Sequence, residues 1–173
     1  ANKEKNGLDI AFFNNINFEG NPVYTDINDN LSVYWHNLSP APGVNSDNFS
    51  VRWNGYITAP VTGEYEFQLN ADDYARVYIN NELFIDCWGG EKVKQTLSKK
   101  INLVAGKQVP IRIEYAEIED IAFINLRWRM TQLSSSSLFR DVAHTSAISD
   151  ATIVVIGETA IEVGESRDST NLN

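Results

Sequence analysis

The chain has 173 residues with 14 basic and 23 acidic side chains, which gives a net charge of −9 at pH 7. An acidic chain without a basic cluster repels phosphate backbones and anionic lipids, so neither nucleic acid nor a membrane is expected as a partner. The single cysteine, Cys87, excludes an internal disulfide, and its apolar neighbours indicate a buried thiol.

The expected elements in chain order are almost all β-strands. Residues 1–7 are polar and are expected to form a linker. From residue 8 onward, short runs alternate between apolar and polar residues, and Gly, Pro and Asn punctuate them. Pro110 lacks a ladder donor, so its strand is expected at a sheet edge, or Pro110 at a strand start. The expected strands cover residues 8–12, 31–35, 49–57, 65–69, 75–79, 82–86, 96–104, 109–115 and 122–128.

The spacing of these strands predicts an all-β fold, an antiparallel β-sandwich or barrel, over residues 8–133. The small polar run 134–137 marks the expected boundary. Residues 138–146 then carry apolar side chains at helical spacing, and residues 153–156 are continuously apolar, as in a strand buried on both faces of a parallel sheet. Residues 134–173 are therefore expected to be a linker, a helix and a strand of a larger α/β domain.

Four segments of the β region together resemble the PA14 family, first described in anthrax protective antigen. The resemblance implies a β-sandwich of the kind found in toxins, yeast adhesins and glycosidases, where it binds carbohydrate or shapes carbohydrate sites. The segments are FSVRWNGYI (49–57), APVTGEYEF (59–67), ADDYARVYI (71–79) and IEY (113–115).

The tail carries a second resemblance, in DATIVVIG (150–157) and GESRDSTNL (164–172). Both segments look like the C-terminal α/β domain of glycoside hydrolase family three, the β-glucosidase family. Some members of that family carry a PA14 domain inserted ahead of this strand and loop. The chain departs from the family at Ser169, where many relatives have Arg, and it stops at Asn173, where the family continues into Leu-Pro. We therefore expect a piece of a longer protein whose barrel domain holds the nucleophile.

The tail loop holds the candidate catalytic residues. By the resemblance, Glu165 is the acid/base, with Glu162 as its rival, and Arg167 and Asp168 contact substrate. A retaining glycosidase needs two carboxyl groups about 5 Å apart, and this chain offers one of them. The isolated chain is therefore expected to be inactive. The structural alternative is a solvated acidic loop.

The adjacent carboxylates Asp72 and Asp73 form the candidate metal site. Carboxylate oxygens suit calcium, and yeast adhesin relatives use such a pair, joined by a cis peptide, to hold calcium that in turn holds a sugar. An Asp pair at a turn also caps backbone amides without any ligand. Calcium is accordingly the one cofactor that the sequence raises.

Trp88 and Tyr74 flank loops and are candidates to stack on pyranose rings. Trp35 and Tyr34 are weaker candidates, because their position beside a loop is less clear. Aromatic side chains are more often core residues than ligand platforms. The sequence alone does not decide whether these aromatic residues belong to the core or stack on a sugar.

Three functions follow from these patterns. The leading one is a carbohydrate-recognition insert that shapes the substrate subsites of a retaining β-glucosidase, with carbohydrate and the remaining enzyme domains as partners. The parent enzyme is then a secreted or periplasmic hydrolase in polysaccharide degradation. The alternatives are a calcium-dependent lectin or adhesin module that uses Asp72 and Asp73, and a spacer domain without a ligand.

Overall fold

The computed structural model describes residues 7–28, 30–89 and 96–133. The chain divides into two units, Ala1–Ser134 and Ser135–Asn173, and all described residues belong to the first. No helix that could span a membrane occurs among them. The helix and strand expected within residues 134–173 lie outside the described residues.

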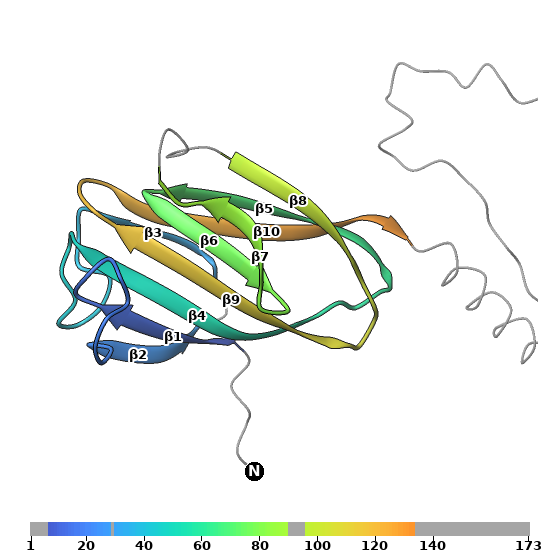
Figure 1. Ribbon diagram of the computed structural model, residues 1–173, viewed down its shortest axis with the longest axis horizontal. Helices are drawn as coiled ribbons and strands as arrows, with labels where there is room; N and C mark the ends of the chain where they lie inside the picture. The colour runs from blue at the N-terminus through green and yellow to red at the C-terminus, as the bar shows by residue number, and fades with distance from the viewer. Residues whose placement is uncertain (1–6, 29, 90–95, 134–173) are drawn as a thin grey trace, which may run out of the picture. The chain divides into compact units, whose positions relative to one another are not determined.

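In the described part of the chain, ten strands form two antiparallel sheets that pack face to face as a sandwich (Figure 1). One sheet has six strands in the order β2-β1-β4-β9-β6-β7, and the other has four in the order β3-β10-β5-β8. The expected antiparallel sandwich is therefore confirmed. The strands are β1 (Leu8–Phe13), β2 (Tyr24–Asn28), β3 (Ser32–His36), β4 (Phe49–Thr58), β5 (Gly63–Asp72), β6 (Tyr74–Ile79), β7 (Glu82–Cys87), β8 (Thr96–Leu103), β9 (Gln108–Glu117) and β10 (Ala122–Leu133).

Strands β4, β5 and β6 follow one another in sequence but alternate between the two sheets. Their inward side chains therefore meet across the interface instead of lining one sheet. Fully buried rings from both sheets fill this interface, among them Phe49, Trp53 and Tyr115 from the six-stranded sheet and Phe67 from the other. Cys87 is also buried, as expected.

Strand β2 was not predicted from the sequence. It pairs only with β1, at an edge of the six-stranded sheet, and its residues are exposed or partly exposed throughout. Because an edge strand of this kind buries neither face, it shows no alternation of apolar and polar residues. Backbone pairing with β1 defines it instead.

Pro110 lies near the start of a central strand, so the expected edge position is wrong, and the alternative, a position at a strand start, is closer to the structure. It is the third residue of β9, which runs between β4 and β6. Its carbonyl accepts a hydrogen bond from the Asn80 N–H (3.0 Å), just beyond the last residue of β6. A residue's N–H and C=O point to the same neighbouring strand, so the missing donor of Pro110 falls where β6 has already ended. No ladder bond is lost.

Candidate functional site

The candidate site lies at the end of the sandwich where β5 passes into β6. Strand pairing brings together three strand termini of the six-stranded sheet there. Glu117 at the end of β9 lies opposite Phe49 at the start of β4, and Tyr74 at the start of β6 lies opposite Ala116. Asp72 ends β5 opposite Phe123 near the start of β10. Residues far apart in the sequence therefore share one end of the fold.

The Asp72–Asp73 connection is tighter than the five-residue turn expected from the sequence. Strand β5 runs through Asp72 and β6 begins at Tyr74, so Asp73 alone links the two sheets. The Asp72–Asp73 peptide bond is cis. Asp72 is only 4% exposed, and the Asp73 carboxylate Oδ2 accepts a hydrogen bond from the Ile118 N–H (2.9 Å). This bond joins the β5–β6 connection to the loop after β9.

Beneath this connection lies a carboxyl group that the sequence analysis missed. Glu117 is 0% exposed, and one of its oxygens, Oε2, contacts the Tyr115 hydroxyl. The same hydroxyl contacts the backbone carbonyl of Asp72. The other oxygen, Oε1, is buried without a hydrogen-bond partner among the described residues. Burial, and the nearby charges of Asp73, Asp72 and Asp47, raise the pKa of Glu117 to about 8, although the Tyr115 hydrogen bond opposes this shift.

The hydrogen-bond inventory supports a neutral Glu117 independently of the charges. The Tyr115 hydroxyl has one hydrogen but touches two acceptors, the Asp72 carbonyl and Glu117 Oε2. If Glu117 is protonated, its own O–H donates to the Tyr115 oxygen, and Tyr115 donates to the Asp72 carbonyl. Every oxygen in the chain of contacts then has a compatible partner. A neutral Glu117 at pH 7 is therefore the arrangement that the geometry favours.

The carboxylates at this end offer the donor type that calcium prefers, but few of them. Calcium takes six to eight oxygen ligands, and Asp72 and Asp73 supply only a part of such a set. Across residues 7–28, 30–89 and 96–133, no three His, Cys, Asp or Glu side chains are grouped in a way that would hold a metal ion. A calcium ion here would need further oxygens from backbone carbonyls, water or a ligand's hydroxyls.

Trp88 and Tyr74 come together on the outer face of the six-stranded sheet, next to the Asp72–Asp73 connection. Their ring centroids are 5.7 Å apart, and Phe18 lies 5.9 Å from Trp88 on another side. The Arg76 guanidinium carbon sits 3.9 Å from the centroid of the Trp88 ring. Trp88 is half-buried, so it is neither a core residue nor a freely exposed ring. Its role as a sugar platform stays a prediction.

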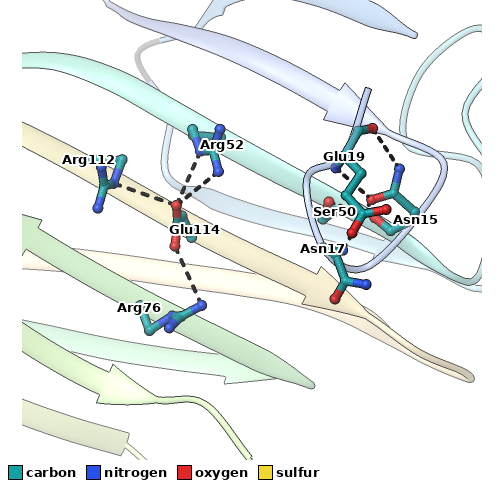
Figure 2. Close-up of polar contacts among 8 residues, drawn as sticks. All are labelled: Asn15, Asn17, Glu19, Ser50, Arg52, Arg76, Arg112 and Glu114. Carbon is teal, nitrogen blue, oxygen red and sulfur yellow. Dashed lines mark hydrogen bonds and ion pairs between the residues drawn. The ribbon is translucent and has the colours of Figure 1, made fainter. Parts of the chain in front are cut away.

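The loop that carries Phe18 is fixed by Asn15 (Figure 2). The Asn15 Oδ1 accepts hydrogen bonds from the N–H groups of Asn17 (3.1 Å) and Glu19 (2.9 Å), and its Nδ2 donates to the Glu19 carbonyl (2.9 Å). The Ser50 hydroxyl of β4 donates to the Asn15 carbonyl (2.7 Å). Phe18 is thus positioned by its own loop and by the sheet beneath.

Next to Trp88, three arginines from three adjacent strands converge on Glu114 of β9 (Figure 2). The Glu114 carboxylate lies 3.1 Å from Arg52 Nη2, 3.6 Å from Arg76 Nη2 and 3.5 Å from Arg112 Nε. Each guanidinium also faces an aromatic ring, Phe18 for Arg52, Trp88 for Arg76 and Tyr78 for Arg112. The sequence placed these arginines at polar positions of separate strands but gave no sign that they meet.

The two weaker aromatic candidates, Trp35 and Tyr34, lie on opposite faces of β3. Trp35 packs into the core against Phe12, Phe49, Trp53 and Tyr115. Tyr34 points to the other side of β3 and is 51% exposed. Its ring stacks on Phe123 of β10, with centroids 5.5 Å apart and planes 18° apart. Trp35 is therefore excluded as a ligand platform, and Tyr34 remains available.

The candidate catalytic residue Glu165, its rival Glu162, and the substrate residues Arg167 and Asp168 lie outside the described residues. Their roles remain expectations from the resemblance.

Comparison with known proteins identifies the sandwich. The model of the PA14 domain family matches residues 4–138. The anti-sigma-I factor RsgI3 of Acetivibrio thermocellus is 34% identical over 144 residues, which cover 80% of this chain and 22% of that protein. The chain thus spans about a fifth of the length of this relative.

Three solved structures show the same fold. An anti-sigma factor domain-containing protein from Clostridium clariflavum superposes with a TM-score of 0.65 at 32% identity, covering 72% of this chain and 42% of that one. The β-glucosidase of Kluyveromyces marxianus, in complex with glucose, superposes with a TM-score of 0.59 at 21% identity. The match covers 82% of this chain and 17% of that one. The A domain of epithelial adhesin 9 of Candida glabrata, in complex with Galβ1-3GlcNAc, superposes with a TM-score of 0.60 at 12% identity. The match covers 75% of this chain and 84% of that one. The family match over residues 4–138 shows that the chain belongs to the PA14 domain family.

Proposed function

We propose that this PA14 domain is the carbohydrate-binding part of a larger protein, and that it binds sugar at the end of the sandwich that carries Asp72, Asp73, Tyr74 and Trp88. One observation carries the proposal: two carboxylates and two partly exposed aromatic rings occupy adjoining segments at one end of the fold. Aromatic faces suit the C–H faces of pyranose rings, and carboxylates accept hydrogen bonds from sugar hydroxyls. The adhesin relative solved with a bound disaccharide supports the same ligand class.

The proposed site has two possible forms, one with calcium and one without. In one form the Asp72 and Asp73 carboxylates hold calcium, and the cation binds sugar hydroxyls; in the other form they contact the sugar directly. The buried, unpartnered Oε1 of Glu117 is an additional oxygen close to these residues. We expect the first form to lose affinity in EDTA and the second to keep it.

The test is calorimetric titration of the full 173-residue chain with glucose, cellobiose and Galβ1-3GlcNAc, in calcium and in EDTA. Trp88→Ala and Asp73→Asn should each weaken binding by about tenfold or more, since each removes a direct contact. Tyr56→Ala is the matched control, because Tyr56 is an exposed ring on the same sheet, away from Trp88. Binding that survives both site variants unchanged would contradict the proposal.

For the parent protein we propose a secreted or periplasmic family-three β-glucosidase, in which the domain shapes the outer subsites and Glu165 is the acid/base. The tail segments 150–157 and 164–172 support this, and so does the match to the Kluyveromyces marxianus enzyme, which covers 82% of the chain. The purified chain should then hydrolyse no nitrophenyl glucoside, while the full reading frame should do so and lose activity on Glu165→Gln. Turnover by the isolated chain would refute this assignment.

The second candidate parent is an anti-sigma factor with a carbohydrate-binding domain. Higher identity favours it, since the anti-sigma relatives are 34% and 32% identical whereas the β-glucosidase is 21% identical. The reading frame separates the two parents. A barrel domain encoded before Ala1 supports the glucosidase, and an anti-sigma factor domain in the same reading frame supports the anti-sigma factor.

A further inference from the structure

The outer face of the four-stranded sheet carries a groove that crosses all four strands. Its volume is about 330 Å³, and its lining includes Tyr34 of β3, Phe123 and Asn125 of β10, Asn70 of β5 and Thr96 of β8. An adjoining hollow of about 360 Å³ shares Gln68 and Arg127 with it. Neither hollow includes any residue of the site proposed above.

The strand register arranges these side chains in rows across the sheet. Ser32, Asn125, Asn70 and Thr96 lie directly opposite one another on β3, β10, β5 and β8. The next row on the same face, two residues along, contains Arg127 and Gln68. At about 4.8 Å between strands and 3.3 Å per residue, the groove is roughly 14 Å in each direction, enough for about two or three sugar units.

The chemistry of this face is unusual for the outside of a sandwich. Beyond Gln68, β5 and its neighbours carry ion pairs, Glu66 with Arg129 (2.8 Å) and Glu64 with Lys100 (2.9 Å). Among the described residues that line the groove, Arg127 is the only charged one, and amides, a hydroxyl and two rings make up the rest. A surface built for solubility alone carries charges, whereas amides beside an exposed ring match a neutral, hydroxyl-rich ligand.

Two amide side chains, Asn70 and Asn125, lie opposite each other in the groove. The Asn70 Oδ1 is buried without a hydrogen-bond partner among the described residues. Asn125 Nδ2 donates to the Ser32 hydroxyl (2.6 Å), which holds that amide in place across the strands. Asn70 is partly exposed on the same face, and amide side chains such as these suit a sugar hydroxyl, because both groups donate and accept hydrogen bonds.

We propose that this face is a second carbohydrate site, which takes a neutral oligosaccharide without a metal ion. Tyr34, stacked on Phe123, presents its ring to one pyranose, while Asn70, Asn125 and Gln68 hydrogen-bond the hydroxyls of the next units. This site goes beyond the proposed function, because it lies on the outer face of the four-stranded sheet and its lining includes none of the residues Asp72, Asp73, Tyr74 and Trp88.

The experiment is titration of the full 173-residue chain with cellopentaose, xylopentaose and laminaripentaose, all in EDTA and in the Trp88→Ala background, which weakens the site at Asp72, Asp73, Tyr74 and Trp88 (the loop site). We expect binding to at least one of these probes. Tyr34→Ala and Gln68→Ala should each weaken it by at least fivefold, while Tyr56→Ala, an exposed ring on the other sheet, should change it less than twofold. Gln68 is exposed, so Gln68→Ala tests the groove even if Tyr34→Ala lowers the melting temperature.

The outcomes separate the two sites. Absence of binding to all three probes in EDTA with Trp88→Ala overturns the second site, and so does binding that ignores both Tyr34→Ala and Gln68→Ala. The loop site fails on its own if sugar binding by the unmodified chain is insensitive to Trp88→Ala and Asp73→Asn.

Discussion

Two glutamates on β9, Glu114 and Glu117, lie three residues apart and have opposite surroundings. Glu114 lies under three guanidinium groups on the outer face of the six-stranded sheet. Glu117 lies at the end of the same strand, fully buried, with a tyrosine hydroxyl and three aspartates near it and no arginine or lysine among the groups that shift its pKa. The first glutamate organises cations that would otherwise repel one another, while the second keeps a proton in place beside the candidate site. Both carboxyl groups are buried, and they differ in their neighbours: guanidinium groups offset the burial of Glu114, whereas Glu117 is buried without a cationic partner and its pKa is raised.

The largest expected effect is that of Glu114→Gln. Removal of the carboxylate leaves three arginines facing one another, partly desolvated, which should destabilise the domain by about 3–5 kcal/mol in urea unfolding. Glu66→Gln is the matched control, since Glu66 pairs with a single arginine whose side chain is 74% exposed, and it should cost less than about 1 kcal/mol. Equal losses for the two variants would show that the cluster behaves as an ordinary surface pair.

The pH dependence of stability tests Glu117. Its pKa is raised to about 8 in the folded state, from an ordinary value of 4.5, so the folded domain retains a proton that the unfolded chain loses. The contribution of Glu117 to the free energy of unfolding should therefore be fully present below about pH 4.5, fall as the pH rises, and level off above pH 8. The total loss should be about 2–4 kcal/mol. Glu117→Gln should remove this fall, with urea unfolding at pH 5 and pH 8 in EDTA as the measurement. A slope that persists in the variant would mean that another group titrates.

A smaller effect is expected for Tyr115→Phe. The substitution removes the hydroxyl between the Asp72 carbonyl and Glu117 but keeps the buried ring, so about 1–2 kcal/mol should be lost. The double variant Tyr115→Phe/Glu117→Gln should lose less stability than the sum of the two single variants, because both residues belong to one chain of hydrogen bonds. Simple additivity in urea unfolding would indicate that the two groups act independently.

The smallest effect concerns the stack of Arg76 on Trp88. A double-mutant cycle with Arg76→Ala and Trp88→Ala should give a coupling free energy of about 0.5–1 kcal/mol, since the cation lies over the ring. A control cycle with Arg129→Ala and Trp88→Ala should give none, because Arg129 belongs to the other sheet. Coupling of similar size in both cycles would point to a general effect of charge.

Much of the fold was predictable because alternation of apolar and polar residues is a local property. The strands β4, β5, β6 and β9 all show it, and each was found within about three residues of its observed bounds, while β10 was found at its start but extends to Leu133, beyond the expected end. Strand β2 was missed because it buries neither face and leaves no such pattern. Glu117 could have been noticed, because it continues the inward phase of Ile111, Ile113 and Tyr115 on β9, where an acidic residue is out of place.

By itself, the sequence determined the β-sandwich class, the PA14 family resemblance and the candidates Asp72, Asp73, Tyr74 and Trp88. Only the tertiary structure decided which residues meet: the strand order β4-β9-β6 brings Arg52 and Arg76 to Glu114, and the order β3-β10-β5-β8 builds the groove beside Tyr34. The physical reason is that alternation fixes which face a side chain takes within its strand, while the neighbour across the sheet depends on pairing between segments far apart in the chain.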